Sequence, residues 1–120
     1  MTATVWRVVY DLSGITMRSD WSVHHDMIRS FADEATRRIY HGYQSRAFPA
    51  EIQRAARKKL RYLEAAHNID DLRVPPGNKL KKLTKERAGQ HSIRINKKWR
   101  ICFTWDNGAH NVEMNNHYED

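Results

Sequence analysis

Cysteine is almost missing from this chain of 120 residues, which has one, at position 102. A disulfide framework within the chain is therefore excluded, and so is a zinc site with the usual spacing of Cys and His. Cys102 itself is expected to be an inert, small strand residue. The sequence also lacks a long apolar run and the core of a signal peptide, so we expect a cytoplasmic protein that does not enter a membrane. Internal repeats and low-complexity blocks are not visible, and the length suits one domain.

Acidic residues are in the minority. The chain has 14 Asp and Glu against 21 Lys and Arg, which gives a net charge of +7 and a pI near 9.8. A charge of this sign favours an anionic partner over a small neutral one. Nucleic acid is the first candidate for that partner, and an acidic protein is the second.

The first 26 residues differ from the rest of the chain. Residues 5–10 could form a short strand, but Ser13-Gly14 interrupts it and no second periodic segment completes a unit. We therefore expect an N-terminal extension over residues 1–26, outside the core of a domain that spans residues 27–120. This domain is predicted to open with a strand at residues 27–31. A short helix comes next, with Asp33 as its N-cap, an end near His41 and Gly42 as its stop.

A second helix is predicted from Pro49, in its first turn, to about His67. Four apolar residues recur at helical spacing and form the face that is expected to pack on a sheet: Ile52, Ala56, Leu60 and Leu63. The opposite side carries a basic stripe of four residues: Arg54, Arg57, Lys58 and Arg61. Such stripes are commonly just solvated. Here the overall charge favours contact with an RNA backbone, because phosphate binding uses clustered Lys and Arg without reading bases.

A basic loop is predicted between this helix and the C-terminal strands. It begins at the irregular segment Pro75-Pro76-Gly77 and then carries five cations: Lys79, Lys81, Lys82, Lys85 and Arg87. A solubilising connector is the alternative interpretation. A loop of this charge beside a sheet is predicted to complete a concave anion site. Leu80 and Leu83 are expected to anchor it to the core.

Residues 90–105 are predicted to form a hairpin, because apolar residues alternate with polar ones in both of its halves. A three-residue turn at residues 96–98 sets Ile93 opposite Ile101, whereas a two-residue turn would mix the faces. Arg94 then lies opposite Arg100. Like charges placed directly opposite each other weaken a sheet, so an anion is expected beside them.

A third strand is predicted after a turn at residues 106–109. The same register gives three further pairs: Phe103 with Val112, Ile101 with Met114, and Arg100 with Asn115. Counting by twos, His117 joins Arg94 and Arg100 on an open, water-facing side. Arginine suits a phosphate and histidine moves protons near neutral pH, so the three could cleave a phosphodiester without a metal. The alternatives are a solvated sheet face and a frayed chain end.

Three motifs carry a family resemblance: D-L-R-x-P-P-G-N-x-L at residues 71–80, R-A-G-Q-H-S-I-R-I-N at 87–96 and K-W-R-I-C-F-T-W at 98–105. In this order, after two predicted helices, they resemble the HigB toxins of the RelE superfamily, over residues 27 to about 118. The resemblance implies an α+β, RelE-like fold, in which an N-terminal strand and a two-helix hairpin pack on a small antiparallel sheet.

The resemblance also implies a function. HigB toxins belong to type II toxin-antitoxin systems and are ribosome-dependent endoribonucleases, which cut translated mRNA in the A site by attack of a ribose 2′-hydroxyl, without a cofactor. The implied partners are a HigA-like helix-turn-helix antitoxin, the ribosome and its mRNA, with operator DNA reached only through the antitoxin complex. The alternative is a catalytically weak or inactive module that binds RNA or the antitoxin through the same surface. A DNA-binding regulator is disfavoured, because helix-turn-helix spacing is missing.

Site roles are implied residue by residue. Arg100 matches the family arginine that contacts the scissile phosphate. The family commonly ends in Asp-Tyr-His, whereas this chain has Asn116-His117-Tyr118, so the acid is lost and the aromatic and imidazole positions are exchanged. The identity of the general base is therefore left open. By the strand register His117 projects where the family tyrosine would, and a histidine there could accept the proton of the 2′-hydroxyl.

Some members of the family also use a histidine and a lysine in the basic loop. This sequence has Lys81 and Thr84 at about those places. Lys81 could supply charge, but it is a poor general base unless its pKa is strongly depressed.

Overall fold

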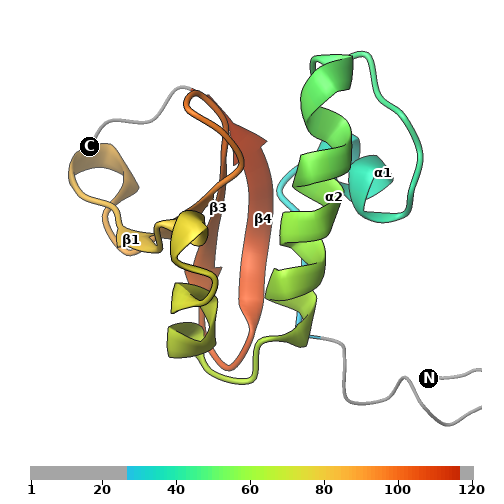
Figure 1. Ribbon diagram of the computed structural model, residues 1–120. Helices are drawn as coiled ribbons and strands as arrows, with labels where there is room; N and C mark the ends of the chain where they lie inside the picture. Colours follow the sequence, from blue (N-terminus) through green and yellow to red (C-terminus); the bar gives the residue numbers. More distant parts are fainter. Residues whose placement is uncertain (1–26, 117–120) are drawn as a thin grey trace, which may run out of the picture.

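The computed structural model describes residues 27–116, which form two α-helices and one antiparallel sheet (Figure 1). The helices are α1 (Glu34–Tyr40) and α2 (Ala50–Ala65), and the strands, in their order across the sheet, are β1 (Lys81–Lys82), β2 (His91–Arg94), β3 (Arg100–Trp105) and β4 (Ala109–Asn115). Three 3-10 turns complete the described elements: η3 (Ile69–Arg73), η4 (Pro76–Asn78) and η5 (Lys85–Arg87). The α+β class is as predicted. The expectations for residues 1–26, His117 and Tyr118 fall outside the described residues.

The segment before α1 lies along the outer edge of β4. It was predicted as a strand, and it is reduced to two isolated parallel bridges, Ile28 with Ala109 and Phe31 with Val112. The interruption comes from Asn111 between them, whose φ of 54° bends β4. Its N–H donates to the hydroxyl of Ser30 at 2.9 Å in place of a backbone carbonyl.

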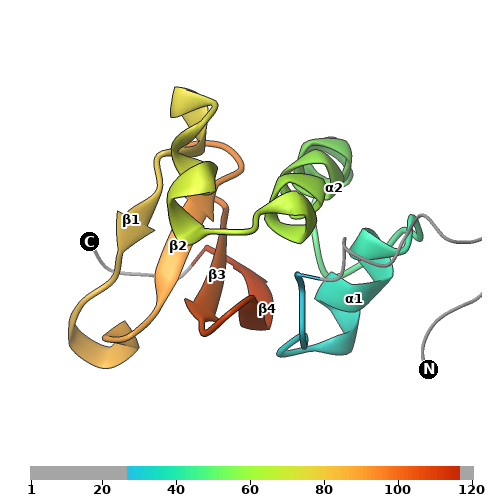
Figure 2. The same cartoon turned by 90° about the horizontal axis from the view of Figure 1, so that it is seen from below.

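Both helices begin and end close to the predicted residues. Asp33 caps α1 by accepting a hydrogen bond from the Thr36 N–H at 2.6 Å, and Gly42 follows the helix with a φ of 92°. The predicted apolar face of α2 is confirmed, since all four of its residues are buried in one cluster with β2, β3 and β4. Figure 2 shows α1 beside α2, at the β4 edge of the sheet. Neither helix of residues 27–116 is long and apolar enough to cross a membrane.

The predicted register of the hairpin is confirmed. Ile93 pairs with Ile101 and Arg94 with Arg100, and the N–H of Ile95 donates to the carbonyl of Trp99 across the three-residue turn. Between β3 and β4 the pairs of Ile101 with Met114 and Arg100 with Asn115 are confirmed. The register then shifts by one residue, so that Thr104 pairs with His110. The expected pair of Phe103 with Val112 falls at this bulge.

The basic loop is more ordered than expected. Lys81 and Lys82 form β1 and pair with Ser92 and His91. Leu83 is buried and Leu80 packs on the core, so the predicted anchors are confirmed.

Asn78, the last residue of the P-P-G-N motif, is fully buried and holds the start of this segment in place. Its amide nitrogen donates to the carbonyls of Leu72 and Val74, and its oxygen accepts from the Lys59 ammonium at 2.6 Å. Asn78 therefore ties η4 both to the preceding turn and to α2.

Candidate functional site

The side of the sheet away from α2 carries two rows of side chains, because paired residues of neighbouring strands project to the same side. The first row is Lys81, Ser92, Cys102 and Glu113, and the second is Arg94, Arg100 and Asn115. The predicted placement of both arginines on one side is confirmed. Lys81 belongs to this side as well, whereas Lys82, the partner of His91, belongs to the other.

The centre of this side of the sheet is not open to water, so the expectation of an open face is wrong for Arg100, while Arg94 is only half-buried. Ser92 and Cys102 are fully buried, and Arg100 is only 6% exposed. The Arg100 guanidinium folds over β2, where Nε donates to the Ser92 hydroxyl at 2.8 Å and Nη2 donates to the Lys79 carbonyl at 3.0 Å. Alternation predicts the direction in which a side chain leaves a strand, but it says nothing of the chain that then packs above it.

The two arginines hold their charged groups in different directions. Arg94 is half-buried, and its Nε donates to the carbonyl of Asn96 in the hairpin turn. Arg100 reaches the opposite way, toward Lys79. Each guanidinium is thus bonded to a backbone carbonyl, which eases the repulsion that the pairing would otherwise cause.

A carboxylate also lies on this side of the sheet. Glu113 accepts from Arg87 at 3.4 Å and from Asn115 at 3.1 Å, and Arg87 also donates to Gln90 at 2.9 Å. Arg87 was predicted to contact RNA phosphate, but it is already engaged by these two partners. Arg87 therefore bridges η5 to β4 across the sheet.

Cys102 lies in the same row as Glu113 and is buried. Burial raises the pKa of its thiol to about 11, with Glu113 adding to the rise and Arg87 and Arg100 opposing it. The thiol therefore stays protonated near neutral pH and is a poor nucleophile, in agreement with the inert role predicted for it.

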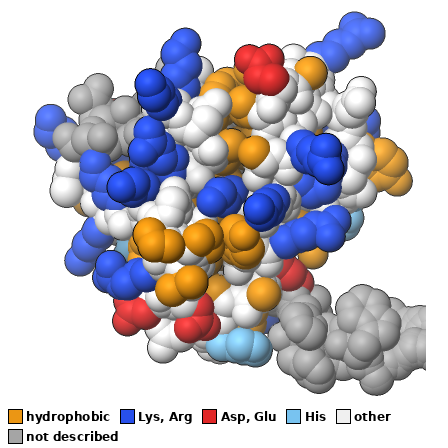
Figure 3. All heavy atoms as spheres, viewed as in Figure 1, with side chains coloured by type: hydrophobic (Ala, Val, Ile, Leu, Met, Phe, Trp, Pro, Cys, Tyr) orange, Lys and Arg blue, Asp and Glu red, His pale blue; other side chains and the backbone are white. Residues whose placement is uncertain are grey.

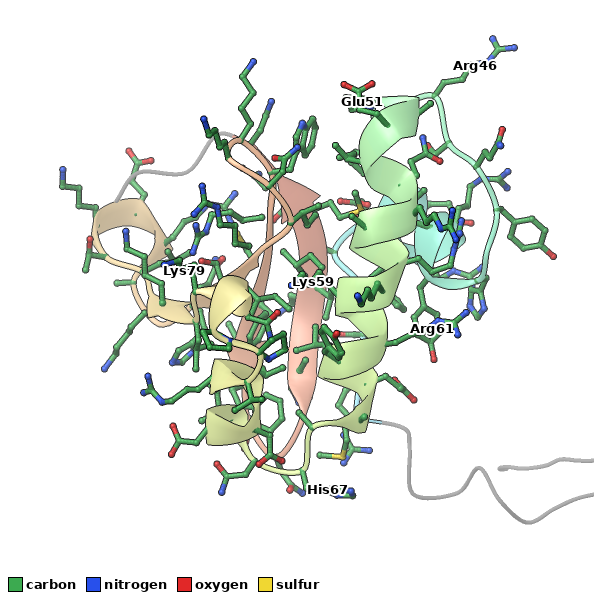
Figure 4. All side chains as sticks on the ribbon, viewed as in Figure 1. Arg46, Glu51, Lys59, Arg61, His67 and Lys79 are labelled. Carbon is green, nitrogen blue, oxygen red and sulfur yellow. The ribbon has the colours of Figure 1, made fainter. Side chains whose placement is uncertain are left out.

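Lys and Arg side chains are spread over much of the face drawn in Figure 3. Two groups of them were predicted to bind RNA. The first surrounds β1 and includes Lys79, Lys82 and Lys85. The second is the α2 stripe, in which Arg54, Lys58 and Arg61 are exposed while Arg57 is partly buried and donates to the Ile39 carbonyl. Figure 4 shows Lys79 and Arg61 on opposite flanks of the molecule. The two predicted RNA-binding groups therefore do not converge on one site.

No group of three or more His, Cys, Asp or Glu side chains within residues 27–116 could hold a metal ion. Ser92, which accepts from Nε of Arg100, is a site residue that was not singled out from the sequence. Its alternation with Ile93 was the available signal.

A two-helix hairpin on one side of a small antiparallel sheet is the arrangement expected of a RelE-like toxin. The family model for the RelE-like toxin of type II toxin-antitoxin system HigB matches residues 29–120. The chain belongs to this family of HigB-like toxins. Membership makes it a toxin of a type II system and implies an antitoxin as its partner.

Two curated proteins are similar to this chain, and the name of the first agrees with this assignment. Toxin HigB-1 of Vibrio cholerae serotype O1 is 37% identical over 84 residues, which are 69% of this chain and 88% of that protein. An uncharacterized protein of Haemophilus influenzae is 34% identical over 91 residues, which are 75% of this chain and 86% of that protein.

Proposed function

We propose that this toxin is a ribosome-dependent endoribonuclease that cleaves translated mRNA in the A site without a metal. The observation that carries the proposal is the direct pairing of Arg94 with Arg100 on one side of the sheet, in a chain of the HigB-like family. The RNA supplies its own nucleophile, the ribose 2′-hydroxyl, so the protein need only align it with the phosphorus and stabilise the charge that develops. A 2′,3′-cyclic phosphate is the product.

Arg100 is the proposed contact to the scissile phosphate, and Arg94 adds positive charge beside it. Because Arg100 is buried, we expect it to exchange its bond to the Lys79 carbonyl for one to the phosphate. The bond to Ser92 would keep the guanidinium in place during that exchange. His117 is the proposed general base, and Tyr118 is the alternative.

The lysines of the β1 segment are proposed to hold the cleaved strand: Lys79, Lys81, Lys82 and Lys85. Arg87 would join them only by leaving Glu113. The α2 stripe lies on the other flank, so we assign its residues Lys58 and Arg61 to RNA of the ribosome away from the cleaved strand. Arg54 and Arg57, the other two residues of the stripe, line a pocket between the helices. We place this activity in the cytoplasm, under the control of a HigA-like antitoxin whose complex with the toxin binds operator DNA.

The Arg100→Ala variant tests the catalytic assignment. We expect it to abolish single-turnover mRNA cleavage on programmed ribosomes and growth inhibition, while antitoxin binding stays nearly intact. Since Arg100 is buried, Arg100→Lys is the companion variant, which keeps the charge and loses the bidentate fork. Arg73→Ala, at an exposed arginine in η3, is the matched control. Undiminished cleavage by a folded Arg100→Ala protein would refute the assignment.

The general base is tested by comparing His117→Ala with Tyr118→Phe. We expect the histidine variant to cleave more slowly, because it removes the proton acceptor, whereas Tyr118→Phe keeps the ring. Equal rates would remove His117 from the mechanism. A wild-type protein that binds programmed ribosomes and cuts no mRNA would favour the alternative, a catalytically inactive binding module.

A further inference from the structure

A pocket of about 650 Å³ lies between α1, α2 and the loop that joins them. Four arginines line it: Arg38 from α1, Arg46 from the loop, and Arg54 and Arg57 from α2. Phe48 and Ala50 give it an apolar part. We call it the α1–α2 pocket. It lies beside the helices, on the side of the sheet opposite to Arg100.

The pocket is held in shape by side chains that bond to the backbone. Gln53 is buried and clamps the loop, donating to the carbonyls of Ser45 and Phe48 and accepting from the Ser45 N–H. Arg38 donates twice to the Gln44 carbonyl. A binding site fixed in this way pays little ordering entropy when a ligand arrives.

The charge of the pocket is one-sided. Its lining, as the described residues give it, holds four guanidinium groups and no carboxylate. Arg57 bonds to the Ile39 carbonyl near the end of α1, and this partner is a dipole without a compensating charge. Four like charges around one hollow repel each other, and an anionic ligand would relieve that repulsion.

The apolar part of the pocket discriminates between two classes of anion. A nucleic-acid backbone needs cations alone, and a base would need an open aromatic face to stack on. Phe48 is 9% exposed, and its ring is T-shaped against Trp99, with 5.5 Å between the ring centroids, so the small apolar area that it offers suits one side chain better than a stacked base. A peptide can use both features, with an apolar side chain on Phe48 and Ala50 and carboxylates on the arginine forks.

We propose that the α1–α2 pocket docks an acidic segment of a partner protein, which places one apolar side chain against Phe48 and Ala50 and pairs its carboxylates with the four arginines. The inference deepens the proposed partnership with an antitoxin and rests on it. The binding surface lies apart from the residues proposed to cleave RNA, so the two proposals can fail separately.

The test measures binding of defined probes to the full chain by fluorescence anisotropy. The first probe is a twelve-residue peptide of Glu and Ala with one central Phe, the second is the same peptide with Gln for Glu, and the third is a twelve-nucleotide polyuridine. We expect the acidic peptide to bind at least about tenfold more tightly than the Gln peptide, because charge-assisted pairs to arginine are lost in the latter.

Three variants locate the binding. The double variant Arg46→Ala with Arg54→Ala should bind the acidic peptide about tenfold or more weakly than wild type. The affinity of the matched double variant, Arg73→Ala with Lys97→Ala, should stay within about twofold of the wild-type value. Ala50→Trp, which fills the pocket and keeps its charge, should also weaken binding.

Three results would overturn the proposal. The first is an equal loss in both double variants, which would indicate unspecific attraction by net charge. The second is polyuridine binding that depends on Arg46 and Arg54 while the peptide fails to bind. The third is full binding by Ala50→Trp. Cleavage by wild type and Arg100→Ala is scored in parallel, so a failed peptide test leaves the proposed nuclease standing.

Discussion

Ser92 accepts a hydrogen bond from Nε of Arg100 at 2.8 Å, and both side chains are buried on the same side of the sheet. The hydroxyl fixes one edge of the guanidinium at the place where β2 and β3 pair. It is also one of the few features of the site that a conservative substitution can remove without changing any charge.

The Ser92→Ala variant is therefore expected to leave the buried Arg100 Nε without this acceptor. Such a loss costs about 1–3 kcal/mol of unfolding free energy, and more where the group is charged. Cleavage should also slow, because the guanidinium loses its orientation. Urea unfolding and single-turnover cleavage measure the two effects. Thr104→Val is the control, since it removes a hydroxyl that makes only a 3.4 Å contact to the His110 carbonyl. If the Ser92→Ala variant had the same unfolding free energy as wild type, the role given to this hydrogen bond would be contradicted.

Gly108 is expected to tolerate no side chain. Its φ is 133°, and a Cβ added there would lie 2.6 Å from Nε of Arg29 and 2.9 Å from the carbonyl of Met27. Gly108→Ala should therefore destabilise the protein by more than about 1 kcal/mol. Gly77→Ala is the matched control, because an added Cβ meets nothing within 4 Å and the change should stay within about 0.5 kcal/mol. Thermal unfolding of the two variants measures the difference. Equal melting temperatures would contradict the prediction, because they would show that the segment around Arg29 moves aside at little cost.

His91 makes stability depend on pH. Burial lowers its pKa, and the charge of Lys82 lowers it further. The unfolded chain, with a histidine pKa near 6.5, therefore binds more protons than the folded one, and stability falls as pH drops through that value. His91→Phe should shrink the difference in unfolding free energy between about pH 7.5 and about pH 5.5. The phenylalanine ring introduced at position 91 can keep the stacking that His91 makes on Phe103. An unchanged difference would remove His91 as a source of acid sensitivity.

A chain that begins at Met27 is expected to fold and to remain toxic. Met27 is buried, and its carbonyl accepts the N–H of Ala109 at 2.7 Å, so the first described contact with β4 is retained. We expect the melting temperatures of the shortened and the full chain to differ by a few degrees at most. A change of about 1 kcal/mol in unfolding free energy causes a shift of that size. A much larger fall would contradict the assignment of residues 1–26 to an extension outside the core.

Local patterns predicted those parts of the fold that depend on neighbouring residues. The alternation around Ile93 and Ile101 was enough to place Arg94 opposite Arg100, and Asp33 and Gly42 were enough to bound α1. The bulge in β4 escaped prediction, because an asparagine with positive φ carries no clear local signal.

Features that depend on contacts between residues far apart in the sequence could not be predicted from local patterns. The burial of Arg100 depends on the Lys79 carbonyl, 21 residues away in the sequence. The α1–α2 pocket brings Arg38 and Arg57 together from two packed helices, and Gln53 fixes the loop between these helices. Neither arrangement leaves a periodic trace in the residues concerned.

Lys81 and Lys82 are consecutive, yet β1 turns them to opposite sides of the sheet. Acetylation of these two amines would therefore have unlike effects. At Lys81 it would remove positive charge from the side that carries Arg100, whereas at Lys82 it would relieve the repulsion that holds down the pKa of His91. Acetylation of Lys81 would weaken the binding of an anion, whereas acetylation of Lys82 would make the His91 imidazole more basic.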